Sequence, residues 1–199
     1  MGGCKCRERD IVEHAMRCAQ KAHDGQFRDD GVTPYFHHPD DVAKRVAKYG
    51  GTYIDESVAY FHDVDEECPN YNIAAALVQM RGAIEWYEYE TILLMVKALT
   101  KDTSIEDRGE RNMDSYRRVI AAPKGTILVK LCDRISNLNG KKLLDERYCR
   151  ETTILIETLS PHVDGAAEHA ALAELNRRHD HMKTLLRGVG DSGCDGNGD

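Results

Sequence analysis

Apolar residues recur along most of the chain at spacings of three and four positions, which is the period of an α-helix. The first such segment carries Ile11, Ala15, Cys18, Ala19 and Ala22, and it stops before Gly25. No stretch alternates between apolar and polar residues, with the period of two, over the length of a strand. The pattern therefore predicts an all-α fold, a helical bundle of about eight or more helices.

Glycines and prolines divide this pattern into separate helices. Pro39 is expected to be the first residue of a second helix that ends at Gly50 and Gly51. Asp55 is expected to cap a third helix that continues through the acidic run and breaks before Pro69. Further helices are expected over residues 72–81, 85–100, 106–121, 125–139, 145–160 and 164–187.

The length of the chain fits one domain. Its 199 residues are enough to bury a proper core, and we expect a single domain over residues 1–187. The last twelve positions, GVGDSGCDGNGD, are rich in glycine and aspartate, and we expect residues 188–199 to be a disordered tail.

The charge of the chain excludes some classes of partner. A net charge of -7 and a pI near 5.7 argue against a general nucleic-acid binder, which carries a basic face. They are compatible with a small phosphorylated ligand held by a metal and a few local cations. No apolar run reaches membrane-spanning length and no leader pattern is present, so the expectation is a soluble, cytoplasmic protein without membrane contact.

The seven cysteines do not form a zinc-binding pattern. Cys4 and Cys6 make a C-x-C at an end that we expect to be frayed, and the others are scattered without any C-x-x-C pair. We expect reduced thiols that mostly fill the core.

The sequence YFHDVDEE, residues 60–67, places four carboxylates within five positions. His62 and Glu66 are four positions apart, and so are Asp63 and Glu67, which puts each pair on one face of a helix. If His62 and Asp63 hold a cation, the two glutamates lie one turn away and can position a water molecule. The alternative is a solvated acidic face of the helix.

A further carboxylate lies in an apolar segment. In TILVKLCDRISN, Asp133 is surrounded by apolar positions that leave little wet surface. It could be a metal ligand supplied by a distant helix, with Asn137 one turn further on facing the same site. It could equally be half of a buried ion pair with Arg134 or another arginine.

The segment TPYFHHP supplies a candidate nitrogen ligand. His38 precedes Pro39, which pushes its backbone out of the α region, and the positive end of a helix favours the neutral imidazole that ligation needs. Periodicity does not choose between His38 and His37. Two nitrogens and two oxygens in such a site would suit Mn²⁺, Fe²⁺ or Zn²⁺.

The order of these motifs resembles the HD-domain phosphohydrolases, and most closely the hydrolase domain of the RelA/SpoT family and its single-domain small alarmone hydrolases. AHDGQFR (residues 22–28) is similar to A-H-x-G-Q-x-R, and PYFHHP to P-Y-x-x-H-P, which selects His38 over His37. HDVDEE is similar to H-D-x-x-E-D, VKALTK to V-x-x-L-T-K, and VKLCDRISN to V-K-L-A-D-R-x-x-N. The resemblance runs from about Ala15 to Asn137.

By position, the resemblance implies roles for individual residues. His38, His62, Asp63 and Asp133 would bind Mn²⁺, with Zn²⁺ or Fe²⁺ as alternatives, and Glu66 and Glu67 would position and activate water. Arg28 and Asn137 would contact a small nucleotide substrate, and Lys130 is a neighbouring cation for its phosphates. The family reaction removes pyrophosphate from the 3′ position of guanosine tetra- or pentaphosphate, (p)ppGpp.

Three positions depart from the family pattern and affect the expected substrate. Glu67 stands where the family has aspartate, Asp29 where a lysine commonly follows the arginine, and Ser136 where histidine or tyrosine is usual. The alternatives to a (p)ppGpp hydrolase are a nucleotide phosphatase or dNTP phosphohydrolase on the same scaffold, and a non-catalytic nucleotide-binding module.

Overall fold

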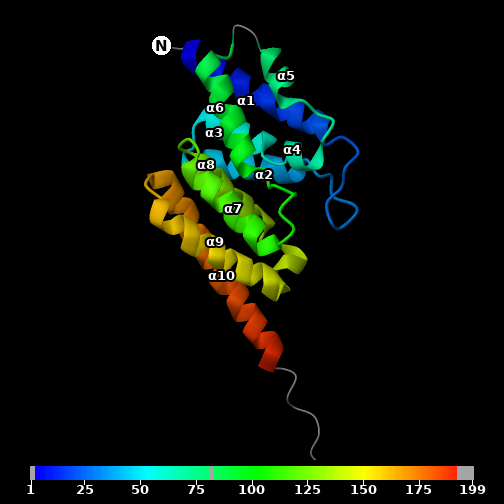
Figure 1. Ribbon diagram of the computed structural model, residues 1–199, viewed down its shortest axis with the longest axis vertical. Helices are drawn as coiled ribbons and strands as arrows, with labels where there is room; N and C mark the ends of the chain where they lie inside the picture. The colour runs from blue at the N-terminus through cyan, green and yellow to red at the C-terminus, as the bar shows by residue number, and fades with distance from the viewer. Residues whose placement is uncertain (1–2, 81–82, 192–199) are drawn as a thin grey trace, which may run out of the picture.

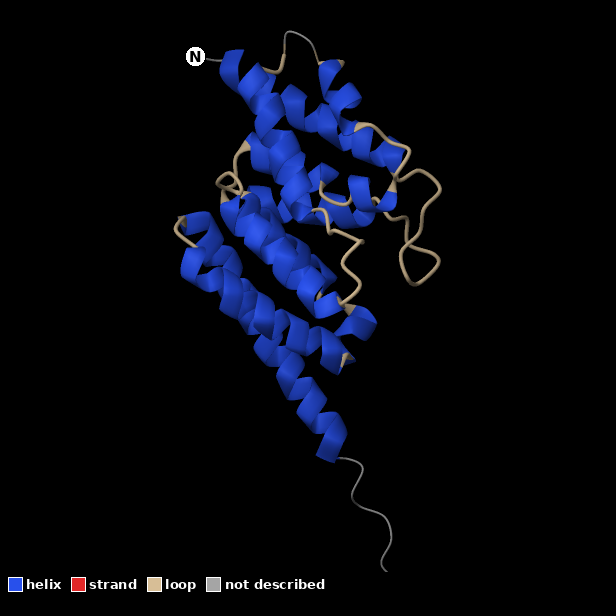
Figure 2. Cartoon of the chain, viewed as in Figure 1, coloured by secondary structure: helices blue, strands red, loops and turns tan. Residues whose placement is uncertain are grey.

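The structure, a computed structural model, describes residues 3–80 and 83–191, and this part of the chain is all-α as expected (Figures 1 and 2). The helices are α1 (Gly3–Ala22), α2 (His37–Tyr49), α3 (Tyr53–Phe61), α4 (Val64–Glu67), α5 (Ile73–Val78), α6 (Trp86–Leu99), α7 (Arg108–Ala121), α8 (Thr126–Asn137), α9 (Glu146–Leu159) and α10 (Ala166–Asp191). Two 3₁₀ turns, η1 (Gly140–Leu144) and η2 (Ser160–His162), flank α9. Within the described ranges the β structure is one isolated bridge, between Phe27 and Pro34.

Helix α8 is the centre of the packing. It contacts α2, α3, α7 and α10, and α3 in turn packs against α1, α2 and α6. Every residue of α8 from Thr126 to Ser136 is buried, including Lys130 and Asp133. Figure 1 shows α7, α8 and α9 in one half of the molecule and α10 extending beyond them at its C-terminal end.

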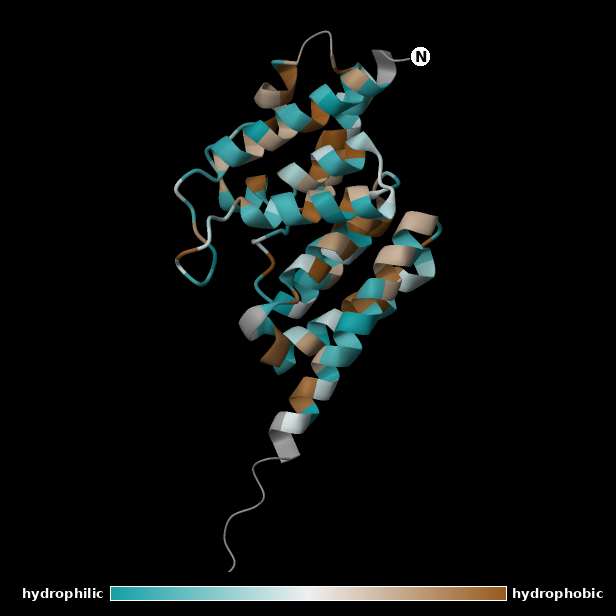
Figure 3. Ribbon diagram, turned by 180° about the vertical axis from the view of Figure 1, so that it is seen from behind, coloured by the Kyte–Doolittle hydropathy of each residue, from teal (hydrophilic) through white to brown (hydrophobic). Residues whose placement is uncertain are grey.

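The other helices are amphipathic, as the spacing of apolar residues predicts. Figure 3 shows hydrophilic and hydrophobic bands alternating around individual helices. The fully buried side chains include Phe61 of α3, Tyr116 of α7 and Leu155 of α9, which come from distant parts of the chain and pack into one core cluster with α8.

The start of α2 differs from the expectation. The helix begins at His37, so Pro39 is its third residue and His38 is helical rather than extended. The first four N–H groups of a helix have no partner inside it, so a proline in the first turn removes no hydrogen bond. The His38 amide instead bonds the Tyr35 carbonyl at 2.9 Å, which sets this turn.

The sequence predicts Asp55 as the cap of α3, and this prediction is wrong. Thr52 is the N-cap, and Asp55 lies three residues later, where its carboxylate accepts from the Thr52 amide at 2.8 Å in a capping box. Asp55 is also buried, and Gly125 passes so close that a Cβ there would lie 1.8 Å from its Oδ1. The glycine has φ +92°, which other residues rarely adopt, so this contact between the loop before α8 and α3 requires glycine.

The acidic run does not lie on one continuous helix. α3 ends at Phe61, His62 is its C-cap, and Asp63 is the N-cap of the separate helix α4. The cause is local, because the His62 Nδ1–H donates to the Ala59 carbonyl at 2.7 Å. In a continuing helix, that carbonyl would accept a hydrogen bond from the Asp63 amide. His62 and Asp63 therefore lie at a bend between two helices, so the run is not one continuous helix. Asp63 and Glu67 are still one turn apart, because the Glu67 amide bonds the Asp63 carbonyl at 2.9 Å.

The two ends of the chain also differ from expectation. Cys4 and Cys6 belong to α1 rather than to a frayed segment. At the other end α10 continues to Asp191, four residues into the expected tail, and the rest of that tail, 192–199, lies outside the described residues. In the described part of the chain, no helix combines the length and apolar character needed to cross a bilayer.

Candidate metal centre

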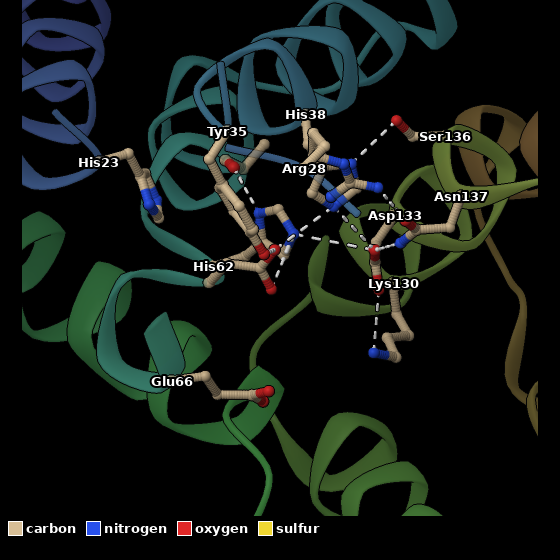
Figure 4. Close-up of polar contacts among 12 residues, drawn as sticks. His23, Arg28, Tyr35, His38, His62, Glu66, Lys130, Asp133, Ser136 and Asn137 are labelled. Carbon is tan, nitrogen blue, oxygen red and sulfur yellow. Dashed lines mark hydrogen bonds and ion pairs between the residues drawn. The ribbon is translucent and has the colours of Figure 1, made fainter. Parts of the chain in front are cut away.

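Two buried histidines from different helices meet beside α8 (Figure 4). His38 projects from the first turn of α2 and His62 from the C-terminal end of α3, with ring centroids 5.1 Å apart. Their side chains are 2% and 3% exposed. An imidazole pair this deeply buried is costly unless the ring nitrogens have partners.

Only one nitrogen of each ring has a hydrogen-bond partner. His62 Nδ1 donates to the Ala59 carbonyl, which leaves a lone pair on Nε2 in the neutral ring. His38 Nδ1 lies 3.1 Å from the Ser136 hydroxyl. In the tautomer that carries its proton on Nδ1, His38 donates to this hydroxyl and keeps a lone pair on Nε2. Both Nε2 atoms are left buried without a hydrogen-bond partner.

The unpartnered nitrogens face two carboxylates. His38 Nε2 lies 3.4 Å from Asp63 Oδ2 and 3.3 Å from Asp133 Oδ1. His62 Nε2 lies 3.3 Å from Asp63 Oδ1 and 3.8 Å from Asp133 Oδ1. The ligand atoms of His38, His62 and Asp133 all lie within 4.8 Å of one another, so these three satisfy the geometry of a metal site together. Asp63 closes the fourth side.

The electrostatics of this cluster require a positive charge. Burial lowers the pKa of His62, but the facing carboxylates of Asp63 and Asp133 outweigh it and raise that pKa to about 9. Burial raises the pKa of both carboxyl groups, yet His62 and His38 hold that of Asp63 well below its usual range, and Lys130 and the histidines do the same for Asp133. The charge can be a proton on His62 or a cation between the four side chains.

The donor set fits a divalent cation. Two imidazole lone pairs and two carboxylates converge, and each histidine is oriented through its other nitrogen, as is general for metal-ligating histidines. Two nitrogens with two oxygens suit Mn²⁺, Fe²⁺ or Zn²⁺, so the residues present do not choose among them.

Ser136 proves to belong to this site. The sequence marks it only as a departure from the family pattern, but its hydroxyl fixes the His38 ring from a position 98 residues away along the chain. A hydroxyl at this position therefore supports a ligand, which sequence spacing alone could not reveal.

The three residues expected to bind substrate form a network behind Asp133. Asn137 Nδ2 donates to Asp133 Oδ1 at 2.7 Å, and Arg28 Nη2 donates to Asn137 Oδ1 at 2.8 Å. Lys130 Nζ lies 3.1 Å from Asp133 Oδ2, so the buried partner of Asp133 is this lysine and not Arg134. Arg134 packs over the Tyr148 ring instead, 4.4 Å from its centroid.

The two glutamates differ from each other in their surroundings. Glu66 Oε1 accepts from the Lys101 backbone amide at 2.5 Å, and Figure 4 shows its side chain apart from the histidine pair. Glu67 is largely exposed, and its carboxylate accepts no hydrogen bond from the described residues. Burial, followed by the charges of Asp63 and Glu66, raises the pKa of Glu67. Of the pair, Glu67 has the free carboxylate.

Most of these groups line one cleft of about 560 Å³, whereas His62 and Ser136 lie behind its wall. Its wall contains acidic groups and His38 together with six cations, Arg28, Lys101, Arg108, Lys130, Arg134 and Lys142. Its volume is in the range of small-molecule sites. A ligand with several negative charges and a few ring atoms matches this lining.

Sequence reasoning missed several members of this cleft, among them Tyr35 and Lys142. Tyr35 donates its hydroxyl to Asp63 Oδ2 at 2.9 Å, and Lys142 Nζ lies 3.4 Å from Asn137 Oδ1. Tyr35 is present in the P-Y-x-x-H-P motif, so the sequence did contain an indication that it belongs to the site. Lys142 lies in the 3₁₀ turn η1 after α8, where the spacing of residues does not predict which way a side chain points.

Comparison with models of known protein families finds none that matches this chain. The resemblance to the HD-domain phosphohydrolases therefore stays a prediction from five short sequence motifs.

Proton release should accompany metal binding at this centre. With a pKa of about 9, His62 is protonated at neutral pH in the metal-free protein and must lose that proton to become a ligand. We expect Mn²⁺ affinity to rise roughly tenfold per pH unit between pH 6 and 8, and to level off as pH passes the pKa. Calorimetry in buffers of different ionisation enthalpy should show about one proton released per cation.

The control for this titration is His181→Gln, which removes an exposed histidine of α10. It should leave both the proton count and the slope unchanged. A metal affinity that does not vary with pH in the parent protein would contradict the assignment of His62 as a ligand.

Proposed function

We propose that this chain is a divalent-metal-dependent phosphohydrolase that removes the 3′-pyrophosphate from (p)ppGpp, leaving GDP or GTP. The observation that carries the proposal is the pair of buried Nε2 atoms, without hydrogen-bond partners, that face Asp63 and Asp133 beside a cation-lined cleft. Unpaired buried polar atoms cost stability, and here two of them converge with two carboxylates, an arrangement that a bound cation would stabilise.

His38, His62, Asp63 and Asp133 would hold the cation, with Mn²⁺ favoured and Zn²⁺ or Fe²⁺ as alternatives. A divalent cation there lowers the pKa of a water molecule and polarises a phosphoryl oxygen. Glu67 would orient and deprotonate the attacking water, and Glu66, held by Lys101, would keep the short helix α4 in place.

The choice of substrate rests on the motifs together with the distribution of charge in the cleft. Lys130 lies beside Asp133, whereas Arg28 and Lys142 converge on the neutral oxygen of Asn137. Two cations that share one neutral acceptor can bind a phosphate at this second position. A nucleotide with phosphates on both sides of its ribose would use both places.

Product analysis tests this proposal. The protein is incubated with Mn²⁺ and ppGpp, and with a panel of nucleoside triphosphates and monophosphates, and the products are separated by chromatography. GDP and pyrophosphate from ppGpp support the proposal. Inert ppGpp with phosphate or triphosphate released from other nucleotides would instead assign a nucleotide phosphatase or dNTP phosphohydrolase, and metal-dependent binding without turnover would assign a nucleotide-binding module.

Asp29 should weaken phosphate binding. Its Oδ2 lies 3.9 Å from Lys142 Nζ, and its side chain is 90% exposed. Asp29→Lys replaces a negative charge by a positive one at the edge of the cleft, so KM for ppGpp should fall severalfold with a smaller change in kcat. The difference between the two proteins should shrink as salt is raised.

Asp24→Lys is the matched control for this substitution. Asp24 is an exposed residue of the same loop but does not line the cleft. Equal effects of the two substitutions would mean that overall charge, and not the position of Asp29, determines KM.

A further inference from the structure

We propose that His23, Gln26 and Tyr35 form a bracket that holds both ends of α4 against the metal ligands. The bracket acts together with the contact between Glu66 and the Lys101 amide. The expected effect on kcat rests on the proposed function, whereas the expected effects on amide exchange and Mn²⁺ affinity do not. We call these three residues the loop bracket.

Helix α4 needs external support. It has four residues, Val64–Glu67, and a helix of one turn is unstable by itself because nucleation is unfavourable. Few backbone hydrogen bonds form within it. The Glu67 amide donates to the Asp63 carbonyl at 2.9 Å, and the Cys68 amide donates to the Val64 carbonyl at 2.8 Å. Contacts from elsewhere must therefore fix it.

Tyr35 holds the N-terminal end of α4. Its hydroxyl donates to Asp63 Oδ2 at 2.9 Å, which sets the rotation of the carboxylate that faces both histidines. The Tyr35 ring stacks on His23, with centroids 4.7 Å apart and an interplanar angle of 22°. Figure 4 shows His23 and Tyr35 adjacent at the edge of the histidine pair.

Gln26 holds the C-terminal end of the same helix. His23 Nδ1 donates to Gln26 Oε1 at 2.8 Å, which orients the amide so that its Nε2 donates to the Glu67 carbonyl at 2.8 Å. The three side chains thus connect Asp63 and Glu67, the residues at the two ends of α4, by one continuous series of contacts.

The bracket also reaches α1 and the substrate side of the cleft. The thiol of Cys68, which follows α4, donates to the Ala22 carbonyl at the end of α1, with 3.2 Å between the two atoms. The guanidinium of Arg28 lies 5.3 Å from the centre of the Tyr35 ring. One loop therefore places a metal ligand, the acidic pair and a substrate-binding cation relative to one another.

Each end of the bracket can be removed separately. Gln26→Leu keeps the size of the side chain but loses both hydrogen bonds. We expect amide exchange at Glu67 and Cys68 to become at least about tenfold faster and kcat to fall about tenfold, with the Mn²⁺ dissociation constant within about twofold of the parent value. Tyr35→Phe loses only the hydroxyl, and it should weaken Mn²⁺ binding about tenfold with little change in KM, because the ring beside Arg28 remains.

His14→Ala is the matched control. His14 Nε2 donates to the Ala76 carbonyl at 3.0 Å, so it also ties α1 to another helix through a backbone carbonyl, but it does not line the cleft. It should change neither exchange in α4, nor Mn²⁺ affinity, nor kcat. Melting temperatures are compared for all variants to confirm that each is folded.

The three measurements separate the two proposals. If the parent protein hydrolyses none of the nucleotides, the proposed function fails, while exchange and Mn²⁺ affinity still decide the bracket. The bracket is overturned if Gln26→Leu changes exchange in α4 no more than His14→Ala does, or if Tyr35→Phe binds Mn²⁺ as tightly as the parent protein.

Discussion

Asp133→Asn is expected to abolish metal binding and hydrolysis while the chain stays folded. Asp133 Oδ1 faces both histidines, and an asparagine of nearly the same shape loses the negative charge that holds a cation there. Metal content should fall from about one equivalent per chain to near zero. Losing a group that only hydrogen-bonds a ligand lowers metal affinity about 10–100-fold, and losing the ligand itself should lower it further. His62→Ala should give the same result.

Metal analysis after gel filtration and circular dichroism together measure this effect. Asp180→Asn, which changes an exposed carboxylate of α10, should retain metal and activity. Normal metal content and turnover in either ligand variant would contradict the assignment of the centre.

The acidic pair should affect the rate and not the metal. Glu67→Gln is expected to lower kcat by about 10²–10⁴-fold with metal content unchanged, because it removes the base while preserving shape. Glu66→Gln should cost less, since glutamine keeps an oxygen that can accept from the Lys101 amide. Loss of metal in either variant would mean that these carboxylates are themselves ligands.

The pH profile adds a second readout for Glu67. A base must be deprotonated to act, and burial and the nearby carboxylates raise the pKa of this group above its usual value of 4.5. Activity should therefore fall on the acidic side at a pH above 4.5, and Glu67→Gln should remove that limb. Identical acidic limbs in the two proteins would assign the limb to another group, with ligand protonation at His62 the next one to test.

The helical fold was predictable from sequence because apolar spacing and glycine or proline boundaries act locally. The ends of α6 and α9, for example, lie within one residue of the expected 85–100 and 145–160. The break between α3 and α4 was not predictable. VAYFHDVDEE contains neither glycine nor proline, and the interruption depends on which way one side chain, that of His62, turns.

The candidate centre was likewise predictable only in part. Asp133 could be singled out because a carboxylate within an apolar helix needs a partner, and the motifs indicated His38, His62 and Asp63. The orientation of the ligands could not be foreseen. Ser136 acts on His38 and Tyr35 acts on Asp63 across the packed interior, and no spacing in the sequence reports such a contact.

The ligands come from α2, the α3–α4 junction and α8, and this separation has a consequence for biosynthesis. His38 and Ser136 meet although they are 98 positions apart. Contacts between such distant residues form late, after the entropy of closing a long loop has been overcome. While a ribosome is still making α7, the nascent chain already contains both histidines but has no complete coordination site. If the proposed cation is bound, we therefore expect the complete site to load only after α8 has docked.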